Sequence, residues 1–454
     1  MPHTRRALRC AVISCLALGT QQSLPAQAPS VFAARQARAY ELLGNGVLIL
    51  RSSWTLPGST APRFEQDASF YYFTGAGQVL GGVLVLDGAF RRAEVFLPRA
   101  LPGILGFTAV DQPRPGARGV SLNVDRVAEW GEFTSFVDGR MTGDFRLPIL
   151  VDDGGDGARF TGGLGSPLDS AALANPWTSW RDAVARRWPG AQVVVDTIAA
   201  ELRSIKDSSE IAVLRKVGAA SAAAFEAGLR AFKPGARQRI VEGAVVDACL
   251  RQGGNGPSFW PWAMSGPNSA FPKPFTSLAS PSHLDRVMQA GEVARLDIGC
   301  EIDHYMGDVG RTVPVSGQFD PGQREVVDLL VAAYRAGLET LRDGVTVEEV
   351  IAASVGEVAR LGSKMKTELG RRAAAIIAQR DSIPFWQIHG VGLEAAERLP
   401  ARLREGMVLA YEPIFSVGEQ GFYMEDMILI TRKGYEILSR GLPTTASEIE
   451  RAMR

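Results

Sequence analysis

The chain has 454 residues, more than one hydrophobic core ordinarily organises, so two domains are expected. Hydrophobic residues make up 46% of the sequence and charged residues 22%, a balance typical of folded globular proteins and not of disordered or membrane-embedded chains. The formal net charge is zero, so the sequence offers no basic surface for nucleic acid or anionic lipid.

The first 28 residues predict a secretory signal peptide. Three arginines precede the apolar run CAVISCLALGT, and Ala26-Gln27-Ala28 provides a cleavage site of small residues. The run is too short and wrongly flanked for a transmembrane helix, so we expect an exported protein, periplasmic or extracellular. The alternative is a mobile hydrophobic leader. Cleavage would leave Cys249 and Cys300, for which a disulfide is compatible with the sequence but not required by it.

An α/β domain with a mixed or parallel sheet is predicted for residues 29–196, because apolar strand-like segments alternate there with helical segments. A helix is expected at about 31–44 and a roughly helical segment at Val120–Val137. The expected strands are Gly46–Arg51, Phe70–Phe73, Gly81–Leu86, Glu94–Leu97, Leu147–Val151 and Gln192–Val195.

Residues 197–454 predict an α+β domain in which helices lie on one side of a curved antiparallel sheet. The boundary is expected near 196–204. A long helical stretch follows, with an Asp-x-x-Glu capping signal at Asp207–Glu210 and a Pro-Gly stop at 234–235. Further helices are expected at about 237–251, 322–342, 346–361 and 365–379.

Two pairs of carboxylates lie in segments that alternate apolar and polar residues about a turn, as the strands of a hairpin do. Symmetric hairpins centred on Ile302–Asp303 and Gly418–Glu419 place the two members of each pair directly opposite each other. Opposed residues have Cβ atoms about 4.5–5.5 Å apart, and ionised carboxylates that close repel unless they share a proton or hold cations. The pairs are Asp297 with Asp308, and Glu412 with Glu425.

His389 adds an imidazole to these four carboxylates. Hard divalent ions favour carboxylate oxygens, and one imidazole shifts the preference towards Mn²⁺, Co²⁺ or Zn²⁺ over Ca²⁺. Two ions about 3.5–4 Å apart can share a water, deprotonate it and polarise a carbonyl. The five residues therefore predict a hydrolase centre with two divalent ions as cofactors, Mn²⁺ being the leading candidate.

At this point the sequence resembles the pita-bread-fold metallopeptidases, and within them the Xaa-Pro aminopeptidases (aminopeptidase P) and the prolidases. The matching motifs are D-x-G…G-D-x-x-R-T at 297–312, H-x-x-G-L at 389–393, E-P at 412–413 and E-D at 425–426. Upstream, RFEQDASFYYFTG at 63–75 and ELRSIKDSSEI at 201–211 resemble the N-terminal domain and the linker helix of aminopeptidase P. The resemblance covers nearly the whole mature chain. It implies an α/β creatinase-like N-terminal domain at 29–196 and an α+β pita-bread catalytic domain at 197–454.

The resemblance also implies a role for each ligand. Asp308 and Glu425 would bridge the two ions, Asp297 would bind one ion, and His389 with Glu412 would bind the other. Glu412 would also take a proton from the metal-bridging water and pass it to the leaving amine. The implied reaction is hydrolysis, by a metal-bridging hydroxide, of the bond between an N-terminal residue and a following proline. Peptides with proline second are the implied substrates, and a homodimer or homotetramer is the implied assembly.

Several outer positions depart from the family pattern. The family carries a histidine at the position where this chain has Ala396. It carries another histidine directly after an S-G-P-N segment, but the S-G-P-N segment of this chain is followed by S-A-F-P-K-P. Tyr423 replaces an arginine two residues before the second glutamate. Losing an oxyanion donor typically costs about 10²–10³ in rate, so weak or redirected activity is an alternative. His304 and Lys273 are candidates to replace the missing groups, although a turn-tip histidine and a solvated lysine are the simpler interpretations.

The leading hypothesis is an exported metallo-aminopeptidase specific for Xaa-Pro. An Xaa-Pro dipeptidase (prolidase) is the near alternative. An alternative from a different functional class is a binding module with the same fold that binds metal but is catalytically weak. A creatinase-type amidinohydrolase needs no metal and is less expected still. Trp260 and Trp262 either line the pocket or belong to the core, and Arg311 either serves the site or balances its charge.

Overall fold

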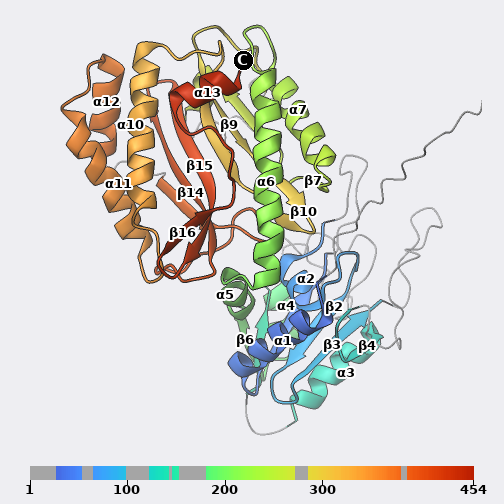
Figure 1. The fold of residues 1–454 in the computed structure, drawn as a ribbon. Helices are drawn as coiled ribbons and strands as arrows, with labels where there is room; N and C mark the ends of the chain where they lie inside the picture. Colours follow the sequence, from blue (N-terminus) through green and yellow to red (C-terminus); the bar gives the residue numbers. More distant parts are fainter. Residues whose placement is uncertain are drawn as a thin grey trace, which may run out of the picture.

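The structure is a computed structural model that describes residues 27–53, 65–98, 122–142, 146–152, 180–270, 285–379 and 386–454. In Figure 1 the residues up to about 196 form one body, and the later residues form a larger one above it. Within the described ranges, no helix has the length and apolar character that crossing a membrane requires. Nearly all of the predicted signal peptide lies outside these residues, so export stays a prediction. The candidate residue Lys273 also lies outside them.

The first body is built on a six-stranded sheet with the order β4-β3-β2-β1-β5-β6. The pairs β1–β2 and β2–β3 are antiparallel, whereas β3–β4, β1–β5 and β5–β6 are parallel, so the predicted mixed sheet is confirmed. Its strands are β1 (Val47–Arg51), β2 (Val83–Asp87), β3 (Arg92–Leu97), β4 (Arg126–Glu129), β5 (Pro148–Val151) and β6 (Gln192–Val195). Its helices are α1 (Pro29–Leu43), α2 (Ala68–Thr74), α3 (Trp130–Arg140) and α4 (Trp180–Arg187).

Helices cover both faces of this sheet. Leu48 and Leu50 of β1 pack in one hydrophobic core with Tyr40 of α1, while the intervening Ile49 packs in a second core with Phe133 of α3 and Trp180 of α4. This alternation follows from the two-residue period of a strand. A strand with apolar residues on both faces reads as a continuous apolar run, which explains why GVLILR could be recognised from sequence.

Two expectations for this body were wrong. Phe70–Phe73 is not a strand but part of α2, which begins where the Asp67 side chain accepts a hydrogen bond from the Phe70 N–H at 2.8 Å. The helix ends at Gly75, whose φ of 68° is left-handed. Within Val120–Val137, only the part from Trp130 onwards is helical, because the preceding residues pair with β3 as strand β4. In both cases local contacts and strand pairing outweighed residue propensity.

The second body contains a sheet with the order β13-β14-β15-β12-β9-β8, to which β16 adds beside β15, and a small sheet with the order β11-β10-β7. The strands are β7 (Gly256–Pro257), β8 (Trp262–Ser265), β9 (Val293–Ile298), β10 (Cys300–Ile302), β11 (Tyr305–Met306), β12 (Val309–Pro314), β13 (Trp386–Gly390), β14 (Val408–Val417), β15 (Gln420–Thr431) and β16 (Gly434–Ile437). The helices are α5 (Ile198–Ser204), α6 (Ser208–Ala231), α7 (Gln238–Arg251), η3 (Gly266–Ser269), α10 (Pro321–Leu338), α11 (Val347–Gly362), α12 (Glu368–Ala378) and α13 (Ala446–Ala452).

The long helices of this body lie on one side of the sheet, as predicted. Gly228 of α6 approaches Leu296 of β9, and Tyr334 of α10 donates a hydrogen bond to Asp426 of β15. Figure 1 shows α6 and α10 flanking the strands. Successive residues of a strand point to opposite faces, so Asp297 and Glu425 lie on the face of the sheet that is turned away from these helices.

Two contacts tie the helices to their surroundings. The predicted capping signal is confirmed, since the Asp207 side chain accepts hydrogen bonds from the backbone of Ser209 and Glu210 at the start of α6. This cap also separates α5 from α6, where the sequence had indicated one long helical stretch. Cys249 of α7 and Cys300 of β10 form a disulfide with their Cα atoms 5.3 Å apart, so the pairing that the sequence left open is present.

Candidate metal centre

The strand register at the first carboxylate pair differs from the predicted register by two residues. Asp297 lies opposite Gly310, not opposite Asp308. The reason is the turn, which is formed by Asp303 and His304 and not by Ile302–Asp303. Both turn residues have left-handed φ values, of 50° and 67°, as a tight two-residue hairpin turn requires. A shift of two residues keeps each side chain on its face, so Asp297 and Asp308 still lie on the same side of the sheet.

The second pair is in the predicted register. Tyr411 lies opposite Asp426 and Ile414 opposite Tyr423, which places Glu412 opposite Glu425 between them. Asp297 in turn lies opposite Gly310 on one side and Trp262 on the other, while Gly310 lies opposite Glu425. A single row therefore crosses five strands, with three carboxylates, one glycine and one tryptophan: Glu412, Glu425, Gly310, Asp297 and Trp262.

His389 completes the cluster from β13. Its Nε2 lies 3.7 Å from Asp308 Oδ2, 3.9 Å from Glu412 Oε2 and 4.0 Å from Glu425 Oε1. One ligand atom from each of Asp308, His389 and Glu425 lies within 4.8 Å of the other two. Side chains from three strands and from Asp308, which directly precedes β12, therefore converge, and their assignment as metal ligands stays a prediction.

The imidazole of His389 is oriented for ligation. Its Nδ1 lies 3.1 Å from the Gly390 carbonyl oxygen, a position suited to Nδ1–H donation, which leaves the Nε2 lone pair directed at the carboxylates. Burial lowers the pKa of His389, so the neutral form that can bind a metal is favoured.

Burial dominates the electrostatics of the carboxyl groups. It raises the pKa of Asp297 to about 6 and that of Glu412 to about 8, with the charge of Arg295 opposing both shifts. The pKa values of Asp308 and Glu425 are raised well above their usual range by burial and then by neighbouring carboxylates. Carboxyl groups in such a cluster either keep protons or need cationic compensation.

One buried oxygen of the cluster indicates that its residues fit divalent ions. Glu425 Oε1 is buried, yet it accepts no hydrogen bond from any residue that the structure describes. It is also the oxygen that lies 4.0 Å from His389 Nε2. A buried oxygen without a donor is costly, and a cation at this position would compensate it. The oxygen-rich donor set with one imidazole suits Mn²⁺, Co²⁺ or Zn²⁺.

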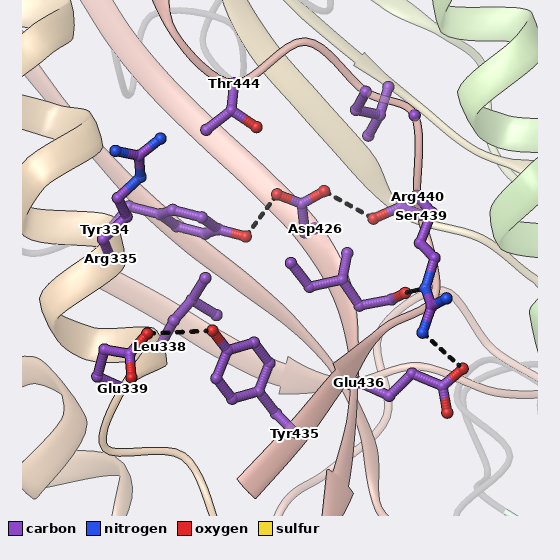
Figure 2. Close-up of a pocket in the computed structure, with 13 residues that line it drawn as sticks. Tyr334, Arg335, Leu338, Glu339, Asp426, Tyr435, Glu436, Ser439, Arg440 and Thr444 are labelled. Carbon is purple, nitrogen blue, oxygen red and sulfur yellow. Dashed lines mark hydrogen bonds and ion pairs between the residues drawn. The ribbon is translucent and has the colours of Figure 1, made fainter.

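Arg311 lies behind this centre and not in it. Its guanidinium donates to Asp426 Oδ2 at 2.8 Å and to the carbonyl oxygens of Gly310, Glu425 and Pro443. Figure 2 shows the Asp426 carboxylate between the hydroxyl groups of Tyr334 and Ser439, on the wall of a cavity of about 700 Å³. These contacts hold β15 from its helix-covered face, so Arg311 has a structural position.

The other candidate residues lie outside the cluster or at its edge. His304 packs its ring 4.4 Å from that of Tyr71, in contact with the first body, so the turn-tip interpretation fits. Trp260 is 55% exposed, whereas Trp262 is half-buried opposite Asp297. Ala396 is exposed.

Sequence reasoning missed two residues of this face, Arg295 and the role of Tyr423. The Tyr423 hydroxyl donates to Glu425 Oε2, and the Arg295 guanidinium lies 5.5 Å from the centre of the Tyr423 ring. Arg295 stands two residues before Asp297, so the alternation of the strand would have placed it on the carboxylate face.

The chain is similar to known peptidases in sequence. Residues 212–432 match metallopeptidase family M24. The Xaa-Pro aminopeptidase of Escherichia coli is 31% identical over 277 residues, which are 56% of this chain and 60% of that protein. The Xaa-Pro aminopeptidase of Haemophilus influenzae is 25% identical over 425 residues, covering 86% and 88%. The Xaa-Pro dipeptidase of Pyrococcus horikoshii is 28% identical over 255 residues, covering 54% and 65%.

The fold of the chain is also similar to that of solved aminopeptidase P structures. Proline aminopeptidase P II from Yersinia pestis superposes with a TM-score of 0.72 at 22% identity, covering 94% of this chain and 99% of that one. A putative aminopeptidase P from Bacillus anthracis gives a TM-score of 0.73 at 19% identity, covering 94% and 98%. The two bodies thus have the fold of these aminopeptidase P structures, and residues 212–432, a little under half of the chain, match metallopeptidase family M24.

Proposed function

We propose that the protein is an exported aminopeptidase that uses two divalent ions, Mn²⁺ foremost, to hydrolyse the bond between an N-terminal residue and a following proline. The observation that carries this proposal is the convergence of His389 Nε2 with the carboxylates of Asp308, Glu412 and Glu425 at 3.7–4.0 Å. The names of the two bacterial relatives, both Xaa-Pro aminopeptidases, support the substrate class.

Each residue has a defined part in the proposed reaction. Asp308 and Glu425 would be shared between the ions, with Asp297 on one side and His389 and Glu412 on the other. Bound ions would supply Lewis acidity to the peptide carbonyl and lower the pKa of a bound water. Glu412 would accept the proton of the attacking water and deliver it to the leaving amine.

The organisation of the chain is part of the proposal. We infer a signal peptide at residues 1–28, an N-terminal domain at 29–196 and a catalytic domain at 197–454. Peptides with proline at the second position would be the substrates, and a homodimer or homotetramer would be the assembly.

Metal-stripped protein resupplied with Mn²⁺ tests the reaction against three substrates. Metal-dependent cleavage of Xaa-Pro-Yaa peptides after the first residue is expected, with little turnover of matched peptides that lack proline. Turnover confined to Xaa-Pro dipeptides would instead assign the activity of a dipeptidase, which is the name of the Pyrococcus horikoshii relative.

Asp308→Asn tests the ligand assignment. It should weaken Mn²⁺ binding by about 100-fold or more and remove activity with it. Asp247→Asn is the matched control, because Asp247 is exposed on α7, where it pairs with the exposed Arg251. Full activity in Asp308→Asn would refute the two-metal mechanism.

A weak or non-catalytic metal-binding module is the second candidate. One observation favours it, namely that exposed Ala396 stands where the family pattern has a histidine. Stoichiometric Mn²⁺ binding without turnover of any of the three substrates would select this candidate.

A further inference from the structure

The cavity of about 700 Å³ in Figure 2 lies on the face of the sheet opposite to the candidate metal centre. Asp426 forms part of its wall, and Asp426 directly follows Glu425 in β15, so the two side chains point to opposite faces. A cavity of this volume is within the range of sites that bind small molecules. There is therefore room for a small ligand that is separated from the metal centre by the thickness of the sheet.

The inner wall of this cavity is apolar or has its charge balanced. Leu338 of α10 is 4% exposed and Leu442 is 8% exposed, and both line the cavity. The Asp426 carboxylate already forms an ion pair with Arg311 at 2.8 Å. The inner wall therefore suits an apolar group and does not call for a cation.

Two opposite charges stand one helical turn apart at the mouth of the cavity. They belong to Arg335 of α10 and to Glu339 at the C-terminal cap of this helix, and both side chains are exposed. Arg335 forms no ion pair or side-chain hydrogen bond with any residue that the structure describes. Glu339 accepts a long hydrogen bond, of 3.5 Å, from the Tyr435 hydroxyl. An arginine that precedes a glutamate by four residues is in the less favourable order for a helical ion pair, which agrees with the two charges being separate.

The other charges at the mouth are already paired. Glu436 accepts two hydrogen bonds from Arg215, at 3.1 and 2.8 Å. Arg440 lies 3.6 Å from the same carboxylate, a contact that Figure 2 shows. Among the described residues that line the cavity, the cation and the anion of the α10 turn are thus the charges that a ligand can satisfy.

The zwitterion of an α-amino acid matches this arrangement. Side chains four residues apart on a helix have Cβ atoms about 5–6 Å apart, close enough for the two charged groups of one amino acid to reach both. Its carboxylate would bind the Arg335 guanidinium, and its ammonium group would bind the Glu339 carboxylate. An apolar side chain would then be buried against Leu338 and Leu442. A simple anion would instead face the charge of Glu339, and a simple cation would face that of Arg335.

We propose that this cavity is a binding site for a free α-amino acid with an apolar side chain, held at its carboxylate by Arg335 and at its ammonium group by Glu339. The proposed peptidase reaction would release free amino acids, but the binding site does not depend on that reaction.

Calorimetry of the full chain with L-leucine tests the proposal, with Mn²⁺ bound and after its removal. One molecule per chain is expected to bind, with an affinity that changes by no more than about threefold on metal removal, because the cavity and the centre share no ligand. N-acetyl-L-leucine lacks the ammonium group and L-leucine amide lacks the carboxylate. Each should bind about tenfold more weakly or worse, because each leaves one charge of the site unpaired.

Arg335→Gln and Glu339→Gln should each weaken L-leucine binding about tenfold, since each removes one charged contact. Both replace exposed side chains, so the variants are expected to fold, which circular dichroism checks. Glu226→Gln and Arg230→Gln are the matched controls, because these residues form an exposed pair of the same two types on α6, outside the cavity. They should bind L-leucine as the wild type does.

Several outcomes would overturn the inference. These are no binding of L-leucine, binding that requires Mn²⁺, and binding that is unchanged in Arg335→Gln and Glu339→Gln. Equal affinity for N-acetyl-L-leucine, or a loss in Arg335→Gln alone, would show that the site takes a carboxylate and not an amino acid. Binding as expected in a protein that cleaves no Xaa-Pro peptide would refute the proposed function and leave this inference standing.

Discussion

At the scale of single residues, the geometry of the candidate metal centre depends on which residues are cross-strand neighbours in the sheet. Gly310 separates Glu425 from Asp297 in the row, and its missing side chain leaves the space that the Tyr423 ring fills. Trp262 ends the row beside Asp297, where a half-buried indole forms an apolar wall next to polar ligands. Small substitutions in this row should therefore have large and different effects.

Gly310→Ala should destabilise the protein by about 1–3 kcal/mol, because the new methyl group would overlap the Tyr423 ring in a packed interior. Urea denaturation of the metal-free protein measures this change. Gly356→Ala is the control, since Gly356 lies in α11 with no atom near its missing Cβ, and it should be neutral or stabilising by up to about 1 kcal/mol. Equal stability of the two variants would contradict the packing argument.

Under the proposed function, Trp262→Leu should raise the KM for Xaa-Pro peptides about tenfold with a smaller change in kcat, because the half-buried indole opposite Asp297 would contact the bound peptide and not the reacting atoms. Steady-state kinetics on a tripeptide series checks this split. Trp260→Leu serves as the control, because Trp260 is 55% exposed and donates to Glu242, away from the row. A loss confined to kcat would show that Trp262 positions the ligands instead.

At the scale of elements, the segment after β13 is held by a buried ion cluster. Glu397 accepts hydrogen bonds from Arg203 at 2.7 Å and from Lys206 at 2.6 Å, and its carboxylate also accepts from the Leu393 N–H. Burial would raise the pKa of Glu397, but the charges of Lys206 and Arg203 outweigh burial and hold it below its usual value. The chain that follows His389 is thereby fixed to the residues that join the two bodies.

Glu397→Gln should cost about 3–5 kcal/mol in the free energy of unfolding, because it leaves Lys206 buried without its counter-charge. Glu394→Gln removes another partner of the same Arg203, but the Glu394 side chain is 54% exposed, so a cost of at most about 1 kcal/mol is expected. Denaturant titration of the two variants compares them directly. Similar losses would show that burial is not what makes the Glu397 contact strong.

At the scale of the whole molecule, a second buried cluster joins the two bodies. Arg35 of α1 lies 2.8 Å from Asp207 and 3.5 Å from Glu210 of α6, and the Tyr305 hydroxyl of β11 donates to Glu210 at 3.2 Å. Burial, with a smaller contribution from Asp207, raises the pKa of Glu210 to about 7, although Arg35 opposes the shift. We therefore expect the contact between the bodies to depend on pH.

The sign of this dependence follows from proton linkage. The folded-state pKa of Glu210, about 7, is above its ordinary value of 4.5, so its contribution to stability is fully present below about pH 4.5 and is lost as the pH rises through about 7. Glu210→Gln should therefore show a smaller fall in Tm than the wild type between pH 5 and pH 8. Glu226→Gln, at an exposed position on the same helix, should keep the wild-type slope. Identical slopes in all three proteins would refute the prediction.

Much of the fold and part of the centre could be predicted from local patterns. The helices after residue 204, the mixed sheet before it and the Glu412–Glu425 register all follow from periodicity, caps and turn position. The strand expected at Phe70–Phe73 failed because the side chain of Asp67 and the left-handed Gly75 close a helix there. The opposition of Asp297 and Asp308 failed because it depends on which two residues adopt left-handed φ values.

The sequence by itself determined which side chains share a face of each hairpin, because the alternation of a strand is a local property that survives a two-residue slip. Only the tertiary structure decided which strands are neighbours. It placed β12 between β9 and β15, brought His389 within 4.0 Å of carboxylates on other strands, and set Arg295 beside Tyr423. Those contacts join residues far apart in the chain, so they depend on the packing of the whole sheet and not on any local pattern.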